Sequence, residues 1–234
     1  MNREPLEHEW YDDEDDSTDV EDPRLYAFPW KEIQIVAALI TLHLGLVFVA
    51  IGPLSQASQL FRQGGLDTES TADQPWRLLT SLFLHADPPH ALWNGLAMLV
   101  FAVPLLLRLG PLRSGLIYLV AGIGGGLTAL HFSESGTVII GSSGAVAGLF
   151  GAWVVVTLRT AGHRLLSWRS RVRTLGVAFL FLPSLLNPTT SAGQPVSVSS
   201  HLGGLATGML VGAVLSFRMR LRSRGEAQPT ESRA

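Results

Sequence analysis

The chain has 234 residues, of which 47% are hydrophobic and only 15% charged, and its mean hydropathy is +0.30. These values exclude an ordinary soluble single domain and are typical of a protein that crosses a membrane several times. The chain contains no cysteine. Disulfides, thiolate metal sites and a cysteine nucleophile are therefore excluded together.

The two ends of the chain differ sharply in charge. Residues 1–22 hold eleven acidic residues against one Arg, so they carry −10 and leave +8 for the rest of a chain whose net charge is −2. A segment so acidic and so poor in apolar residues cannot bury a core. We expect residues 1–30 to be a disordered cytoplasmic tail, without a cleaved signal peptide, and the basic residues 219–234 to be a second such tail.

Apolar segments fill the region between the tails. Each is close to the roughly 20 helical residues that cross a hydrocarbon layer. The pattern predicts an all-α bundle of six membrane helices in one domain, 31–218, with its helices at about 32–52, 88–107, 112–132, 143–159, 172–187 and 199–217. The fifth helix is short and contains Pro183, so we expect it to be kinked or mobile and to act as a gate through Phe179, Phe181 and Leu182.

The positions of Lys and Arg predict the orientation, because loops on the cytoplasmic side are enriched in both. With both termini inside, fifteen of the seventeen Lys and Arg residues lie on the inner side, and only Arg62 and Arg77 lie outside. The second, fourth and sixth helices then all begin at the outer face. The loop before the second helix, about 53–87, ends in an amphipathic, aromatic stretch and is expected to lie in the membrane interface.

A serine motif opens the fourth helix. The sequence Gly141-Ser142-Ser143-Gly144 places a hydroxyl between glycines at a helix N-terminus, where unpaired backbone N–H groups favour developing negative charge. Ser143 is the candidate nucleophile. A serine hydroxyl needs a neighbouring base, and His201, in the first turn of the sixth helix, is the leading candidate.

Small residues predict how the two helices meet. Gly144 and Gly148 in the fourth helix, like Gly204 and Gly208 in the sixth, are spaced four apart, which allows two backbones to approach closely in lipid. Glu32, at the inner end of the first helix, is the only Asp or Glu inside the six predicted helices. The pattern therefore predicts a Ser-His dyad without the carboxylate of a triad.

A second polar set supplies hydrogen-bond donors for an oxyanion. His90 and Asn94 are four apart and share a helix face, so with the backbone N–H of Ser143 they form a candidate oxyanion hole. His85 cannot share that face and is expected to brace the preceding loop. A zinc site of His85, His90 and His201 is the competing interpretation, but it lacks an acidic ligand and a Glu base.

Three other histidines are weaker candidates for the base. His43 is isolated in the first helix, His163 lies on the arginine-rich inner loop, and His131, at the outer face, is kept in reserve. We expect no cofactor, no metal and no nucleic-acid partner, and the oligomeric state stays open.

At these residues the chain resembles the rhomboid intramembrane serine proteases, over about residues 30–218. The motifs that match in order and spacing are Trp76-Arg77, His85-x4-His90-x3-Asn94, Gly141-x-Ser143-Gly144 and His201-x2-Gly204-x3-Gly208. The resemblance implies a six-helix core, Ser143 as nucleophile with Ser142 only its neighbour, His201 as base, and oxyanion assistance from His90 and Asn94. It implies action in a cell membrane on single-pass membrane proteins, with the site opening to the extracytoplasmic side.

Three positions depart from the family's usual pattern. Ala147 replaces an aromatic residue that packs on the catalytic histidine in many relatives, Leu106 replaces a glutamate that often ends the second helix, and Ser200 replaces an alanine. None of these changes removes a catalytic group. Two rival functions are considered: a non-catalytic rhomboid-like binder of membrane proteins, which would have lost Ser143 or His201, and a transporter, which would show internal repeats and broken helices at mid-membrane.

Overall fold

The computed structural model describes residues 30–51, 62–160, 176, 186 and 196–226. The predicted fifth helix, with the proposed gate residues Phe179, Phe181 and Leu182, lies outside the described residues apart from two isolated positions. The described elements are, in chain order, α1 Trp30–Ile51, β1 Leu66–Asp67, α3 Arg77–Thr80, the 3₁₀ helix η2 Ser81–Phe83, α4 Pro88–Leu109, α5 Pro111–Phe132, β2 Val138–Ile139, α6 Ser143–Thr160 and α8 Val198–Glu226.

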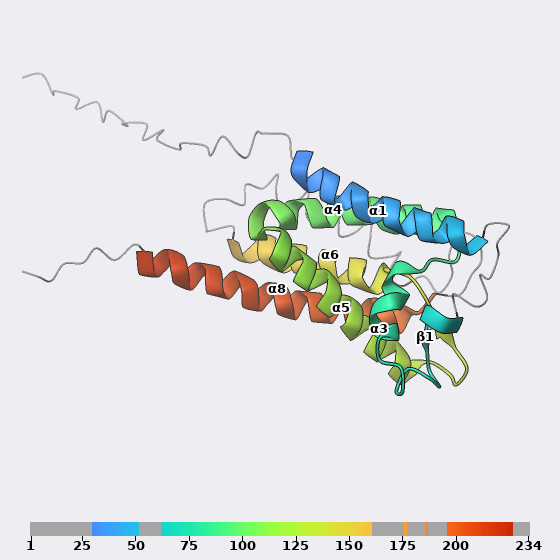
Figure 1. Ribbon diagram of the computed structural model, residues 1–234. Helices are drawn as coiled ribbons and strands as arrows, with labels where there is room; N and C mark the ends of the chain where they lie inside the picture. Colours follow the sequence, from blue (N-terminus) through green and yellow to red (C-terminus); the bar gives the residue numbers. More distant parts are fainter. Residues whose placement is uncertain (1–29, 52–61, 161–175, 177–185, 187–195, 227–234) are drawn as a thin grey trace, which may run out of the picture.

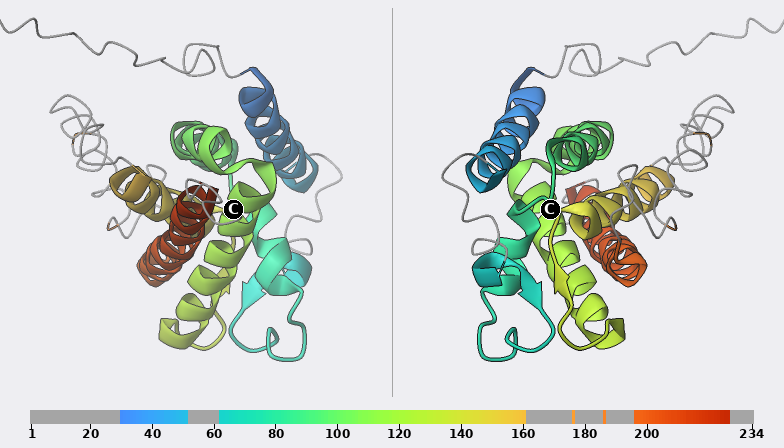
Figure 2. Two further views of the ribbon diagram at one scale, coloured as in Figure 1. Left: turned by 90° about the vertical axis from the view of Figure 1, so that its left-hand side faces the viewer. Right: turned by 90° about the vertical axis from the view of Figure 1, so that its right-hand side faces the viewer.

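The long helices form a bundle in which α5 and α6 each pack on α4, on α8 and on one another (Figures 1 and 2). Helix α1 packs on α4, α4 packs on α6 and α5, and α8 packs on both α5 and α6. Among the described residues, three helices are long and apolar enough to cross a membrane, Pro88–Leu109, Pro111–Phe132 and Val198–Phe217, and Ser143–Arg159 is a shorter apolar helix. The predicted helical membrane protein is confirmed, whereas the count of six helices stays a prediction.

Helix α4 begins where its sequence provides a cap. The Asp87 carboxylate accepts a hydrogen bond of 2.7 Å from the backbone N–H of His90. Pro88 and Pro89 fill the first turn, where a missing backbone N–H costs nothing because no helical partner exists for it. This local chemistry fixes the position of His90 in the first turn of α4.

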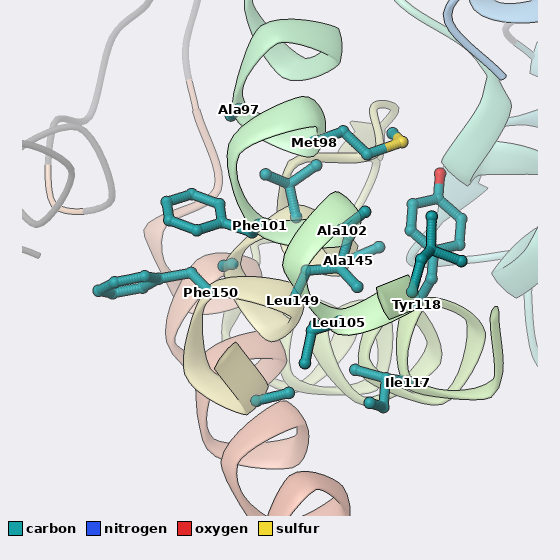
Figure 3. Packing of buried hydrophobic residues seen from close by; sticks show 14 of the residues in the cluster. Ala97, Met98, Phe101, Ala102, Leu105, Ile117, Tyr118, Ala145, Leu149 and Phe150 are labelled. Atoms are coloured by element: carbon teal, nitrogen blue, oxygen red, sulfur yellow. The ribbon is translucent and has the colours of Figure 1, made fainter. Parts of the chain in front are cut away.

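An apolar cluster holds α4, α5 and α6 together (Figure 3). Phe101 and Leu105 of α4, Ile117 of α5 and Leu149 of α6 are each at most 1% exposed. The aromatic ring of Phe101 lies 5.1 Å from that of Phe150, centroid to centroid. Because α4 carries His90 and Asn94 and α6 begins with Ser143, the cluster fixes the framework on which these candidate site residues lie.

The contact between α6 and α8 is made by backbone. A Cβ atom on Gly204 would overlap the Gly144 carbonyl, and one on Gly208 would overlap the Gly148 carbonyl. A Cβ on Gly148 would overlap Ala121 of α5. The predicted close approach of the two helices is thus present, and it leaves no room for a side chain at these glycines.

At the end of the bundle opposite Ser143, a hydrogen bond joins α4 to α6 near Leu106, the position at which many relatives carry a glutamate. Leu106 is buried among apolar residues. Two residues later, the Arg108 guanidinium donates a 2.9 Å hydrogen bond to the Thr157 hydroxyl of α6. Arg108 and Thr157 therefore link α4 to α6 at this end.

Two loops at the other end are paired through a short antiparallel ladder. Leu66 of β1 pairs with Ile139 of β2, and Asp67 pairs with Val138. The sequence predicted no strand, because a two-residue ladder has no periodicity to detect. The ladder ties the loop before α3 to the loop before α6, and so to the serine motif.

Candidate active site

The loop before α6 is held in a conformation that presents Ser143 at the helix start. Gly141 has φ +119°, a region that residues with a side chain rarely adopt, and its N–H donates to the Ser81 carbonyl at 2.9 Å. The Ser142 carbonyl accepts the first helical hydrogen bond, from Val146, also at 2.9 Å. Ser143 is the first residue of α6, where backbone N–H groups have no helical partner and the dipole favours an anion.

His201 occupies the matching end of α8. The Ser197 hydroxyl accepts a 3.2 Å hydrogen bond from the backbone N–H of Ser200, and the Ser197 carbonyl accepts from the N–H of His201 at the same distance. These bonds start the helix and fix His201 in its first turn, where the side chain is buried. Replacement of Ser197 by alanine, asparagine or glycine would remove the hydroxyl that accepts from the Ser200 N–H.

Ser200 and Gly144 bring the two helix ends together. A Cβ on Gly144 would lie 2.6 Å from the Ser200 hydroxyl oxygen. Since Ser143 precedes Gly144 and His201 follows Ser200, the serine and the histidine flank this contact. The Ser200 side chain therefore packs against Gly144, between α8 and α6. Ala147, which replaces the usual aromatic residue, is fully buried.

His90 lies against the serine loop from the side of α4. A Cβ on Gly141 would lie 3.2 Å from Cε1 and 3.5 Å from Nε2 of the His90 ring, so Gly141 provides room for this ring as well as the unusual φ. His90 is also close enough to His201 for the charges of the two rings to interact. The Asn94 side chain donates to the His90 carbonyl at 3.1 Å, which holds the amide one turn along the same helix.

His85 contacts the serine loop directly. Its Nε2 accepts from the backbone N–H of Ser142 at 3.3 Å and lies 3.2 Å from the Ser142 hydroxyl oxygen. Its ring meets that of His90 edge to face, with centroids 5.1 Å apart. His85 therefore contacts the loop that precedes α6, whereas the sequence predicted that it would brace its own loop, the one before α4.

His43 is not isolated, contrary to the sequence interpretation. Its ring meets that of His85 edge to face at 5.0 Å, and the Tyr118 hydroxyl lies 3.5 Å from His43 Nε2. The sequence did not single out Tyr118. The sequence interpretation of His43 as isolated failed because no motif in α1 or α5 predicts that these helices pack beside His85. A histidine on the apolar face of a membrane helix was the available signal.

The predicted support residue Arg77 is buried and holds the loop that precedes α3. Its guanidinium donates to the Gln74 side chain at 2.7 Å, to the Gly65 carbonyl at 2.8 Å and to the Arg62 carbonyl. Trp76, next to it, is 52% exposed, as expected for an aromatic residue at a membrane interface. Arg77 therefore joins the segments on both sides of β1.

Two alternatives fit the geometry less well. The reserve base His131 is exposed near the end of α5 and contacts the Phe132 ring. Within the described residues, no three His, Cys, Asp or Glu side chains are grouped so that they could hold a metal ion.

Burial of His85 predicts a pH dependence of stability. Its pKa is lowered from 6.5 to about 3, first by burial and then by the neighbouring His90 and His43. Between these values the unfolded chain binds a proton that the folded chain does not. The stability that neutral His85 provides is therefore complete above about pH 6.5 and is lost as the pH falls toward 3, by up to about 1.4 kcal/mol per pH unit.

Thermal unfolding in detergent at pH 7, 6, 5 and 4 measures this dependence. His85→Gln is expected to have a lower Tm than wild type at pH 7 and a flatter decline toward pH 4. His131→Gln, which removes an exposed histidine, is the matched control. Equal pH slopes for wild type and His85→Gln would show that His85 does not resist protonation.

These features define a helical membrane protein in which a serine and a histidine begin two closely packed helices. Comparison with known proteins gives the family. The Rhomboid domain matches residues 72–218, more than half of the chain. The chain therefore belongs to the rhomboid family.

Individual relatives agree with this assignment. The chain is 32% identical over 170 residues to RHOMBOID-like protein 6, mitochondrial, and 33% identical over 173 residues to RHOMBOID-like protein 4, both of Arabidopsis thaliana. These matches cover 70% and 72% of this chain but 52% and 41% of the relatives. Rhomboid-type serine protease 2 of Emericella nidulans is 29% identical over 150 residues, 64% of this chain and 28% of that protein. The chain thus spans about half or less of these relatives' lengths.

Proposed function

We propose that the chain is an intramembrane serine endopeptidase that cleaves the membrane segments of single-pass proteins with a Ser143-His201 dyad. One observation carries this proposal: Ser143 and His201 flank the contact of Gly144 with Ser200, at the starts of two helices whose backbones touch. Membership of a family in which a relative is named a serine protease supports it.

The proposed chemistry assigns each group one task. Ser143 attacks the carbonyl of the scissile peptide bond while His201 takes its proton, and His201 then gives that proton to the leaving amine. Water then attacks the acyl-enzyme. His201 takes a proton from that water and returns it to the Ser143 oxygen as the acyl group leaves. The backbone N–H of Ser143, with His90 and Asn94, donates to the oxyanion of each tetrahedral intermediate.

The proposed substrate enters from the lipid. Its helix must unwind locally to expose a peptide bond, and irregular backbone is costly in lipid. Segments that contain glycine, alanine, serine or proline near the outer face are therefore the expected substrates. The proposed domain spans 31–218 with both termini in the cytoplasm, in the cell membrane, and the site opens to the extracytoplasmic side.

Cleavage by the wild-type protein in proteoliposomes tests the proposal. The substrate is a single-pass reporter whose membrane segment carries Gly-Ala-Ser near the outer face, and the matched control replaces that stretch by leucines. We expect two products whose new ends lie within the outer third of the membrane segment. The leucine control should be cleaved at least tenfold more slowly. Capture of the intact reporter without cleavage would favour the non-catalytic binder.

A further inference from the structure

A buried polar network lies behind the serine loop and is not used by the chemistry above. It contains His43 of α1, His85 of the loop before α4, Tyr118 of α5 and Ser142 of the loop before α6, which are 2%, 1%, 7% and 0% exposed. Four segments that are distant in the sequence each contribute one polar side chain. Because burying polar groups is costly, such a network persists only where its members satisfy one another.

The proton position on His85 follows from its partner. A backbone N–H can only donate, so His85 Nε2 accepts from Ser142 and a neutral ring carries its proton on Nδ1. No acceptor among the described residues is aligned to receive that proton, although the Phe83 carbonyl is near enough to act electrostatically. The edge-to-face ring of His43, at 5.0 Å and 88°, is the neighbour that can accommodate the edge of the His85 ring.

His43 is itself fixed from several sides. Its Nδ1 lies 2.7 Å from the Leu39 carbonyl, and its Nε2 lies 3.3 Å from the Leu82 carbonyl. Its ring stacks on Phe83 at 5.5 Å. Contacts with α1 and η2 therefore fix the plane of the His43 ring. The fixed ring packs against His85.

Tyr118 closes the network. Its hydroxyl lies 3.5 Å from His43 Nε2 and near enough to the Ser142 side chain to interact with it electrostatically. Figure 3 shows this hydroxyl pointing away from Ile117 and Leu105 of the apolar cluster. One hydroxyl of α5 thus contacts both the first helix and the residue that precedes Ser143.

Both peptide groups around Ser142 are then restrained. His85 holds the N–H of Ser142, and Val146 holds its carbonyl. We propose that His43 and Tyr118 are positioning residues of the serine centre, which hold His85 and Ser142 and, through them, the loop that carries Ser143. This inference rests on the proposed function, in which Ser143 is the nucleophile. A displacement of about 1 Å of a reacting group can slow catalysis a hundredfold.

Two conservative variants test the inference. Tyr118→Phe removes one oxygen, and His43→Phe keeps an aromatic ring while removing both nitrogens. For each variant we measure fluorophosphonate labelling of Ser143, kcat and KM for the reporter in proteoliposomes, and the Tm. We expect labelling and kcat to fall about tenfold with KM within twofold of wild type. His131→Phe, an exposed histidine outside the network, is the control and keeps wild-type rates.

A double variant separates positioning from general loosening. Because Tyr118 and Ser142 share a contact, Tyr118→Phe combined with Ser142→Ala should lose less than the product of the two single losses. Wild-type labelling and kcat in Tyr118→Phe would overturn the inference, as would losses explained entirely by a smaller folded fraction. If His43→Phe fails to fold, Tyr118→Phe decides alone. An inactive, unlabelled wild type overturns the proposed function as well, whereas active wild type with unchanged variants overturns this inference only.

Discussion

Ser143→Ala and His201→Ala will each lower reporter cleavage by at least about a thousandfold and abolish fluorophosphonate labelling. Removal of the nucleophile leaves no oxygen to acylate, and removal of the base leaves a serine that is almost fully protonated at neutral pH. The two groups act in one step, so Ser143→Ala/His201→Ala should be no slower than the slower single variant. Labelling of purified protein in detergent, followed by the cleavage assay in proteoliposomes, measures both effects.

Ser142→Ala is the matched control for this series. It removes the neighbouring hydroxyl, keeps the Ser142 N–H that His85 holds, and should retain labelling at a reduced rate. Each variant must first show a cooperative thermal transition near that of wild type. Labelling that persists in Ser143→Ala and disappears in Ser142→Ala would show that Ser142 is the nucleophile and that the assignment to Ser143 is wrong.

Gly208→Ala will lower the free energy of unfolding by about 2 to 4 kcal/mol. A Cβ at this position overlaps the carbonyl of Gly148, which is backbone and cannot rotate away. The two helices must separate or shift, and overpacking of this kind outweighs the roughly 1 kcal/mol that alanine gains over glycine in a helix. Since α6 and α8 carry Ser143 and His201, activity should fall together with stability.

Gly115→Ala is the control for this prediction. Gly115 also lies in a long membrane helix, α5, but nothing lies within 4 Å of a Cβ placed on it. This variant should be as stable as wild type or more stable by up to about 1 kcal/mol. Thermal unfolding of both variants in one detergent gives the comparison. Equal Tm values for Gly208→Ala and Gly115→Ala would show that the α6 to α8 contact is not tight.

The sequence predicted the helices well where local chemistry marks their ends. Asp87, Pro88 and Pro89 announce the start of α4, and the predicted helix 88–107 was observed as Pro88–Leu109. Glycines spaced four apart predicted the contact of α6 with α8. Ser143 was expected in the first turn of its helix and is its first residue. The roles of Ser143, His201, His90 and Asn94 stay predictions, which the variants above test.

Tertiary neighbours were the part that the sequence could not supply. Within its own helix His43 contacts only the Leu39 carbonyl, and Leu82, His85 and Tyr118 reach it only when α1, η2 and α5 are packed together. The pairing of Leu66 with Ile139 likewise joins segments that no local pattern relates. Spacing within one helix reveals a shared face, but contacts between helices depend on rotation and depth, which apolar residues on all sides do not specify.

The ladder of β1 and β2 has a consequence for exchanging parts between relatives. Between Ile139 and Ser143 only three residues remain, and one of them, Gly141, is tied to Ser81. An insertion there would change the register of the nucleophile directly, whereas extra residues at the Glu134–Gly136 tip, beyond the ladder, would leave it in place. Chimaeras that borrow an outer loop from another rhomboid should therefore transplant both strands as one cassette and place new length only at the tip.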